Sequence, residues 1–253
     1  MQGRIWTGSN ILFSTYAEHF FDYDSIWVQD KMASGTPERP ALSQLYLNKL
    51  QSTVRLHLLP YFENKKFSLI KPNDIKEFRL FLLREKKISF KTVNDIIAVL
   101  KIITDVALTD DILIASPLRG IKPLINNSGP RDAFTIKEAK AIFNADWKNN
   151  ETARMFNFIA ACTGMRLSEI NAIRKENLKP TYIDLKDQLL RGKLSPLKTK
   201  EARRIPICDE IYNILKNRIS SDYAFVIGQN IGSKCLAKIL ARIMPEEKKR
   251  TWI

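Results

Sequence analysis

The sequence predicts a mainly α-helical protein of two domains, in which a helical bundle precedes an α+β domain with a small antiparallel sheet. Three observations support this fold class. The chain has 253 residues, 45% of them apolar and 27% charged, which is enough for two folded domains of ordinary size. Apolar residues recur at helical spacing through the first hundred residues, and short β-type runs cluster between residues 181 and 207.

Four amphipathic helices are expected in the first domain, which we place at residues 11–115 after an N-terminal extension of residues 1–10. Their apolar stripes are Phe13/Tyr16/Ala17/Phe20, Leu47/Leu50/Val54/Leu58, Ile75/Phe78/Leu82 and Val93/Ile96/Ile97/Leu100/Ile103. Helix-breaking stretches separate these stripes, at residues 35–40, Pro60, Pro72 and residues 86–89.

Residues 116–130 change composition to SPLRGIKPLINNSGP, which has three prolines and two glycines and predicts a linker. The second domain is then residues 131–253. Thr135-Ile-Lys-Glu138 has the form of a capping box, so we expect a helix from residue 136 to 145 and another over 151–163. Strands are predicted in TYIDL (181–185), in the QLLRGKL region and in RRIPI (203–207), followed by helices near 209–218 and 233–243.

The charge of the chain favours a polyanionic partner. The net charge is +14 and the isoelectric point is near 9.7, which is typical of proteins that bind nucleic acid or an acidic membrane surface. The excess is uneven, because residues 1–129 hold 17 basic and 13 acidic residues, whereas residues 130–253 hold 24 and 14. The second domain is therefore the basic one.

Cysteine spacing and hydropathy exclude several classes of protein. Cys162, Cys208 and Cys235 are far apart and form no Cys/His ligand pattern, so neither a structural metal site nor a disulfide framework is expected. No stretch approaches 18 uninterrupted apolar residues, and no signal peptide opens the chain. We expect an intracellular protein that is not inserted in a membrane.

The stretch ACTGMRLSEI, residues 161–170, carries the most specific chemistry. A buried helical stripe runs up to Cys162, and Thr163-Gly164 then supplies the residue types of a tight turn. Arg166 follows at the expected start of a new helix, where a guanidinium fork suits two oxygens of one phosphate. Glu169, three residues later, is placed to hold Arg166 or a backbone amide. Without further context, an ordinary ion pair on a helix explains the same spacing.

As a whole, TGMRLSEI resembles the first arginine motif of the tyrosine recombinases, the phage integrase family. The resemblance implies that Arg166 is a catalytic residue that contacts the scissile phosphate, with Glu169 supporting it. Downstream, LKTKEARRIPI resembles the β-hairpin lysine of the family, and Lys198, eight residues before Pro206, is identified with that catalytic lysine in preference to Lys193 or Lys200. Its expected role is proton delivery to the departing 5′ oxygen; simple contact with a phosphate is the alternative.

The resemblance extends to the whole chain. It implies an N-terminal four-helix SAM-like core-binding domain that clamps double-stranded DNA, and a tyrosine-recombinase catalytic domain in residues 131–253. Residues 179–204 carry eight basic and three acidic residues, and the expected DNA-binding side chains among them are Lys193, Lys200, Arg203 and Arg204. The family's chemistry needs no metal or other cofactor. Expected partners are a DNA duplex and, on it, a second copy or a full-length recombinase, in the cytoplasm of a prokaryote near its nucleoid.

The sequence departs from the family pattern after the lysine hairpin. A complete tyrosine recombinase continues with His-x-x-Arg and a nucleophilic tyrosine, but the two histidines here, His19 and His57, both lie in the first domain. None of the seven tyrosines stands in the nucleophile's place. We therefore expect a truncated catalytic domain that does not cleave DNA alone, because electrostatic help cannot replace an absent nucleophile. A prophage remnant, a frameshifted reading frame and a fragment all fit this expectation.

Two other functions remain as alternatives. The chain is then either a non-catalytic DNA-binding regulator that competes with an intact integrase, or a basic helical adaptor for protein or RNA in which the TGMRLSEI match is a coincidence. The target sequence, the choice among integration, excision and resolution, and the oligomeric state have no signature in the sequence.

Overall fold

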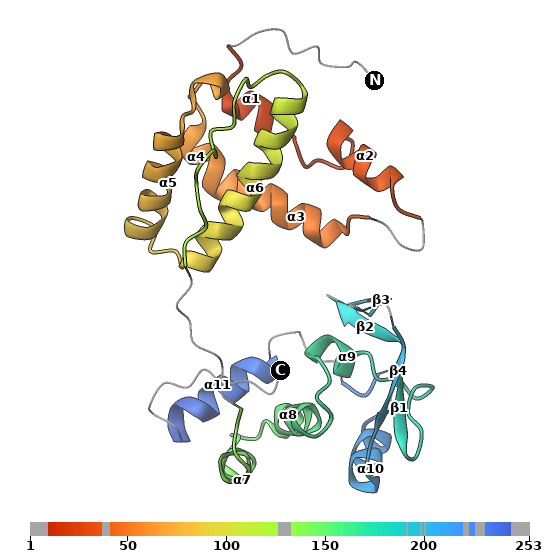
Figure 1. The fold of residues 1–253 in the computed structure, drawn as a ribbon. Helices are drawn as coiled ribbons and strands as arrows, with labels where there is room; N and C mark the ends of the chain where they lie inside the picture. The colour runs from red at the N-terminus through yellow and green to blue at the C-terminus, as the bar shows by residue number, and fades with distance from the viewer. Residues whose placement is uncertain are drawn as a thin grey trace. The chain divides into compact units, whose positions relative to one another are not determined.

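The computed structural model describes residues 10–36, 41–125, 133–190, 192–197, 199, 201–219, 223–225 and 231–243 (Figure 1). The chain divides into two compact units, Met1–Ser128 and Gly129–Ile253. Lys198 and Lys200 lie outside the described residues, as do nearly all of the predicted N-terminal extension and residues 126–130, the last third of the predicted linker.

In the described residues of unit 1, the regular elements are all helices, and an isolated β-bridge joins Leu12 and Lys66. The residues of the four predicted stripes lie on helices except for Phe20, which lies in a turn after the first helix, and the structure adds a helix at residues 26–33 that the sequence did not predict. The elements are α1 Phe13–Ala17, α2 Ile26–Ala33, α3 Gln44–Thr53, the π-helical turn η1 Val54–Leu58, α4 Leu59–Phe62, the 3-10 turn η2 Phe67–Leu69, α5 Pro72–Arg84 and α6 Phe90–Thr109.

The predicted break at Pro60 is wrong, because the chain stays helical from α3 through η1 to the end of α4. The backbone N–H of Leu59 donates to the carbonyl of Val54, five residues back, which is the π-helical pattern. Pro60 then occupies the first turn of α4, where a missing N–H costs least. The breaks at Pro72 and before Phe90 are confirmed, since Pro72 opens α5 and the side chain of Ser89 caps α6.

The core of unit 1 is rich in aromatic side chains. Phe13 meets Phe67 edge to face at 5.2 Å between ring centroids, and Phe62 meets Phe78 at 4.9 Å. All four rings are buried. They join α1, α4 and α5 in one apolar cluster with α6.

The first part of the predicted linker packs on unit 1. Leu118, Ile121 and Leu124 contact its core. The side chain of Asn94 accepts from the backbone N–H of Leu124 at 2.9 Å and donates to the carbonyl of the same residue at 2.8 Å. Residues up to at least 124 are therefore held to α6 by packing and by paired hydrogen bonds.

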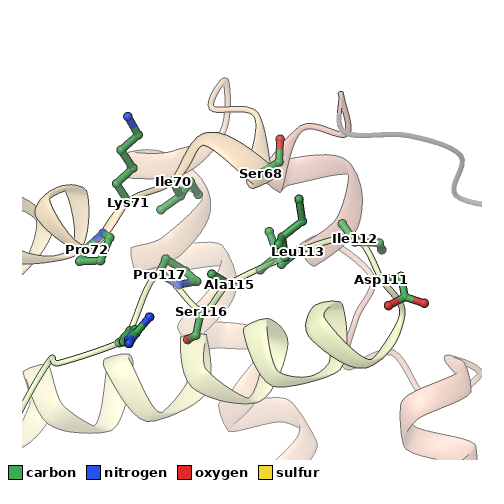
Figure 2. A pocket seen from close by; sticks show the side chains of 12 residues that line it. Ser68, Ile70, Lys71, Pro72, Asp111, Ile112, Leu113, Ala115, Ser116 and Pro117 are labelled. Carbon is green, nitrogen blue, oxygen red and sulfur yellow. The ribbon is translucent and has the colours of Figure 1, made fainter.

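A pocket of about 430 Å³ lies at the start of this segment. Figure 2 shows how its lining side chains come from two stretches, residues 68–72 before α5 and residues 111–119 after α6. Two of its apolar lining residues, Ile70 and Leu113, are buried in the core of unit 1. The pocket belongs to unit 1 alone.

The second unit confirms each predicted helix and strand to within a few residues. Its elements are α7 Ile136–Asn144, α8 Glu151–Thr163, α9 Leu167–Asn171, β1 Tyr182–Leu185, β2 Asp187–Leu190, β3 Lys193–Pro196, β4 Arg203–Pro206, α10 Asp209–Arg218 and α11 Ile231–Ile243. The predicted capping box is present, because Thr135 Oγ1 accepts from the N–H of Glu138 while the Glu138 carboxylate accepts from the N–H of Thr135.

The predicted small sheet consists of two separate antiparallel pairs. Strand β1 pairs with β4, so that Ile183 lies opposite Ile205, and strand β2 pairs with β3 as a hairpin. Gly192, in the turn of this hairpin, has a φ of 77°, a conformation that suits glycine. Alternate residues Ile183 and Leu185 of β1 are buried, whereas strands β2 and β3 themselves have no fully buried side chain. Only the β1–β4 pair therefore forms part of the core.

Helix α8 lies between two apolar clusters of unit 2, as its central place in the unit suggests (Figure 1). Phe156 and Ile159 pack with the β1–β4 pair, α9 and α10. Ala153, nearer the start of α8, packs with Trp147 and α11 in the other cluster. The C-terminal end of α8 is thereby fixed in position for the residues that follow it.

We expect Phe62→Ala to destabilise unit 1 by about 3–5 kcal/mol, because it removes a buried ring that contacts Phe13 and Phe78. Urea unfolding monitored by circular dichroism measures this change. Leu56→Ala is the matched control on the same helical stretch: its side chain is 70% exposed, and the free energy of unfolding should stay within about 0.5 kcal/mol of the parent value. Equal losses in both variants would contradict the assigned core.

Candidate functional site

The site begins with the turn that ends α8. Gly164 has a φ of 64° and its N–H donates to the carbonyl of Ala160, so it closes the helix in the left-handed conformation. Thr163 Oγ1 donates to the carbonyl of Ile159 at 2.6 Å and accepts from the N–H of Met165 at 3.3 Å. Met165 is fully buried in the core. The turn therefore leaves Arg166 as the N-cap residue of α9, as the sequence predicts.

Glu169 accepts two hydrogen bonds from Arg166. Its Oε2 accepts from the backbone N–H of Arg166 at 2.8 Å, and its Oε1 accepts from Arg166 Nη1 at 2.9 Å. The two possibilities considered from the sequence, a hold on the arginine and a hold on a backbone amide, are thus both realised. The Glu169 side chain is 1% exposed, whereas that of Arg166 is 40% exposed. The carboxylate is inside and the guanidinium reaches outward.

A second arginine shares the same carboxylate. Arg203, at the start of β4, donates from Nη2 to Glu169 Oε2 at 2.8 Å, and its side chain is 36% exposed. It lies 34 residues from Glu169 in sequence, and the β1–β4 pair brings it there. Its neighbour Arg204 lies opposite Asp184 of β1, and its guanidinium sits over the ring of Tyr182, 4.9 Å from the centroid.

Electrostatics keep this carboxylate charged. Burial alone would raise the pKa of Glu169, but the Arg166 N–H and the guanidiniums of Arg166 and Arg203 outweigh it, so the pKa lies below its ordinary value. Glu169 is also the only charged side chain among the described residues that is classed as buried. Two guanidiniums and one carboxylate give the cluster a net charge of +1.

The arrangement is suited to binding an anion. Each guanidinium has five N–H donors and donates one of them to Glu169, so roughly four donors of each are not used by the carboxylate. Within the part of the chain that the structure describes, neither guanidinium has a second carboxylate partner. Helix α9 is only five residues long, and the N–H of its N-cap is already bound by Glu169. The anion-binding capacity therefore rests on the arginine side chains rather than on the helix terminus.

The structure brings together three of the predicted site residues, Arg166, Glu169 and Arg203. Arg204 is separate from them, on the Tyr182 ring. Lys193 opens β3 and is exposed. The expected convergence of Lys198 on the same anion as Arg166 stays a prediction, because Lys198, like Lys200, is outside the described residues.

Gln188 is a residue of the site region that sequence reasoning missed. Ser168 Oγ of α9 donates to Gln188 Oε1 at 3.1 Å, and Gln188 Nε2 donates to the carbonyl of Pro196 at 2.7 Å. These bonds tie the β2–β3 hairpin, which carries Lys193, to the helix that follows Arg166. A single glutamine 20 residues from its partner has no spacing that would reveal this role.

The described residues contain no group of three or more His, Cys, Asp or Glu side chains placed to hold a metal ion. In the same residues, the search for a helix with the length and hydropathy of a membrane span finds none.

We expect Glu169→Gln to lower the stability of unit 2 at neutral pH by about 1–3 kcal/mol, because two guanidiniums lose their charged acceptor while remaining partly solvated. The folded-state pKa of Glu169 is lowered, so its contribution is complete above the unfolded pKa near 4.3 and is lost as pH falls through the lower folded pKa. The difference in free energy of unfolding between parent and variant should therefore be constant at neutral pH and should begin to shrink as the pH falls below about 4.3.

Glu151→Gln is the control for this series, since Glu151 pairs with Arg154 at 2.8 Å but is 53% exposed. Its effect should stay within about 0.5 kcal/mol. A difference between Glu169→Gln and the parent that does not change with pH would show that the charge of Glu169 contributes nothing.

The fold is similar to those of solved integrases. The Tn1549 transposon integrase in complex with a circular intermediate DNA aligns with a TM-score of 0.68 and 19% identity, over 89% of this chain and 81% of that chain. A lambda integrase dimer bound to a COC′ core site aligns with a TM-score of 0.70 and 12% identity, over 90% of this chain and 63% of that chain.

No protein-family model matches the sequence, and no curated protein matches it either. At these levels of identity the likeness concerns the fold. With Arg166 at the turn after α8 and a helical unit before it, the chain has a fold similar to that of these integrases, as expected from the resemblance of its TGMRLSEI motif.

Proposed function

We propose that this chain is a site-specific DNA-binding protein of the tyrosine-recombinase type, whose ligand is a DNA duplex. The observation that carries the proposal is the pair of guanidiniums held on the buried carboxylate of Glu169. Its support comes from the fold, which is shared with integrases solved in complex with DNA. The division of the chain into a core-binding domain at residues 11–115, a linker at 116–130 and a catalytic-type domain at 131–253 is part of the same proposal.

The charge distribution supports a duplex as the ligand. Residues 130–253 hold 24 basic and 14 acidic residues, and DNA presents a regular array of phosphates to which such an excess binds with release of counterions. In this proposal Lys193, Lys200 and Arg204 contact backbone phosphates without doing chemistry. Arg166 contacts the phosphate at the centre of the site.

The geometry of the cluster supports a role for Arg166 in the chemistry at that central phosphate. A guanidinium directed by Glu169 stabilises negative charge that develops on phosphate oxygens, because its donors are already oriented before the charge appears. Lys198 is proposed to protonate the departing 5′ oxygen. Both roles assist a nucleophile and do not replace one.

We propose that these 253 residues do not cleave DNA by themselves. Their only histidines, His19 and His57, belong to unit 1, so unit 2 contains no His-x-x-Arg sequence. The tyrosines of unit 2 are Tyr182, Tyr212 and Tyr223. Tyr182 lies under the guanidinium of Arg204, Tyr212 is on α10, and Tyr223 forms an isolated β-bridge with Arg174, and we propose none of them as a nucleophile.

A second candidate function is a regulator that occupies recombination sites without cutting them. The observation that favours it is that Arg166 and Arg203 are both held by Glu169 in position to bind a phosphate, although no residue of the chain is assigned as a nucleophile. On DNA such a chain would act beside a second copy or a full-length recombinase. Lambda integrase has been solved as a dimer bound to a COC′ core site and as a tetramer bound to a Holliday junction. We place both candidates in the cytoplasm of a prokaryotic cell, where the proposed ligand is. Adding the chain to a recombination reaction of an intact integrase from the same element tests the regulator, since inhibition is expected.

We expect steep salt dependence of duplex binding. If six or more phosphates are neutralised, log affinity should fall against log salt with a slope of roughly −5 or steeper. Fluorescence anisotropy with a labelled duplex, selected by the protein from a random library, measures the slope.

Arg166→Ala should weaken duplex binding about tenfold or more at fixed salt, because a charge-assisted contact to a phosphate is lost.

Lys140→Ala is the matched control for Arg166→Ala. It removes the same charge from an exposed position of α7, outside the Glu169 cluster, so its effect on affinity should be several-fold smaller. The proposed function would be refuted by a chain that is folded, as shown by circular dichroism, yet binds no duplex at low salt.

We further expect no covalent protein–DNA adduct. Duplexes of the selected site, each nicked at a different position to trap a cleavage intermediate, should release all DNA from the protein on a denaturing gel. A complete tyrosine recombinase with its own nicked site is the positive control. Discovery of an adduct, mapped by mass spectrometry to any tyrosine of the chain, would overturn the non-cleaving part of the proposal and leave the DNA-binding part intact.

A further inference from the structure

We propose that Arg203 and Arg166 bind one and the same phosphate, as a two-arginine clamp whose base is the buried carboxylate of Glu169. The inference rests on the proposed function and deepens it, because it assigns a phosphate ligand from β4 in addition to the arginine at the α9 N-cap. It differs from a general role of Arg203 in attracting DNA, since it specifies which phosphate is bound.

The distances place the two guanidiniums side by side. Arg166 Nη1 is 2.9 Å from Glu169 Oε1, and Arg203 Nη2 is 2.8 Å from Glu169 Oε2. The two oxygens of a carboxylate are separated by about 2 Å, so the two nitrogens cannot be more than about 8 Å apart. A single phosphate placed between two guanidiniums can accept from both across such a span.

The different burial of the three side chains determines the side from which an anion can approach. Glu169 is 1% exposed, whereas the Arg166 and Arg203 side chains are 40% and 36% exposed. An anion therefore reaches the guanidiniums from the solvent side and does not have to displace the carboxylate. The backbone N–H of Arg166 also donates to Glu169, and the turn after α8 with its buried Met165 fixes the backbone before Arg166. Arg203 is positioned by the β1–β4 pairing, so neither arginine depends on Glu169 alone for its position.

The charge of the cluster matches one anion rather than two. Two guanidiniums and one carboxylate give a net charge of +1, which a single phosphodiester neutralises. Two separate phosphates would leave the cluster with an excess of negative charge around a buried carboxylate, which is unfavourable in a partly desolvated site. The pKa of Glu169 is lowered, so the carboxylate stays charged at neutral pH and this balance holds there.

Arg204 provides a contrast on the same strand. Successive side chains of a strand point to opposite faces, and the Arg204 guanidinium lies over the ring of Tyr182, 4.9 Å from its centroid, while Arg203 bonds Glu169. The two adjacent arginines have equal charge but different surroundings. Comparing substitutions of these two arginines therefore distinguishes a clamp on one phosphate from a general electrostatic effect of β4.

The test replaces single phosphates of the selected duplex by uncharged methylphosphonates, one position at a time, and measures affinity by anisotropy. For the parent chain, substitution at one phosphate position should lower the affinity roughly tenfold or more relative to the unmodified duplex. In R166A and in R203A, the loss at that same position should shrink to a few-fold or less, because a ligand of that phosphate has already been removed. In R204A the loss at that position should remain as large as in the parent, whatever its overall affinity.

The outcomes are distinguishable. If the position affected by R203A differs from that affected by R166A, the clamp is refuted while the proposed DNA binding stands. R203K serves if R203A unfolds, since it keeps the charge but lacks the fork, and it should likewise reduce the loss at the shared position. Circular dichroism of each variant monitors folding.

Inorganic phosphate tests the clamp without DNA. At constant ionic strength it should raise the melting temperature of the parent chain and of R204A, but not of R166A or R203A. If the parent binds no duplex but shows this pattern, the proposed function fails and the anion clamp survives. If phosphate gives no such shift and no duplex binds, both are refuted.

Discussion

The buried carboxylate of Glu169 is the interaction on which the site depends. A charged group that is 1% exposed is unfavourable unless its oxygens are satisfied, and here a backbone N–H and two guanidiniums supply the donors. The same contacts join the N-terminal end of α9 to strand β4. A feature that would be costly alone thus positions two cations beside each other at the surface.

The core of unit 2 explains why those contacts form. Helix α8 packs on both of its sides, with Phe156 and Ile159 against the β1–β4 pair and Ala153 against Trp147. Its C-terminal end cannot shift without disturbing either cluster, and buried Met165 fixes the turn that follows. Packing energy in the two clusters is therefore what holds Arg166 in place, and the ion pairs act on a backbone that is already positioned.

Local signals predicted the elements well where they were strong. The capping box at Thr135 and Glu138, the Thr163-Gly164 turn and the β-type runs up to residue 207 are all realised, because each depends on residues close in sequence. The helix at 26–33 was missed because only Val28 of its side chains is buried, so it has no apolar stripe. The break predicted at Pro60 was wrong because the π-helical turn η1 precedes it, so Pro60 lies in the first turn of α4, where a proline does not interrupt the helix.

The sequence by itself determined the order of most helices and strands and the basic character of the second half. It also determined that Arg166 begins a helix in which Glu169 follows three residues later, since all of these depend on composition and short-range spacing. Only the tertiary structure decided that Arg203, and not its neighbour Arg204, shares the carboxylate of Glu169, and that Gln188 ties the hairpin to α9. The physical reason is that these contacts join residues 20 or 34 positions apart through strand pairing and core packing, which no local pattern encodes.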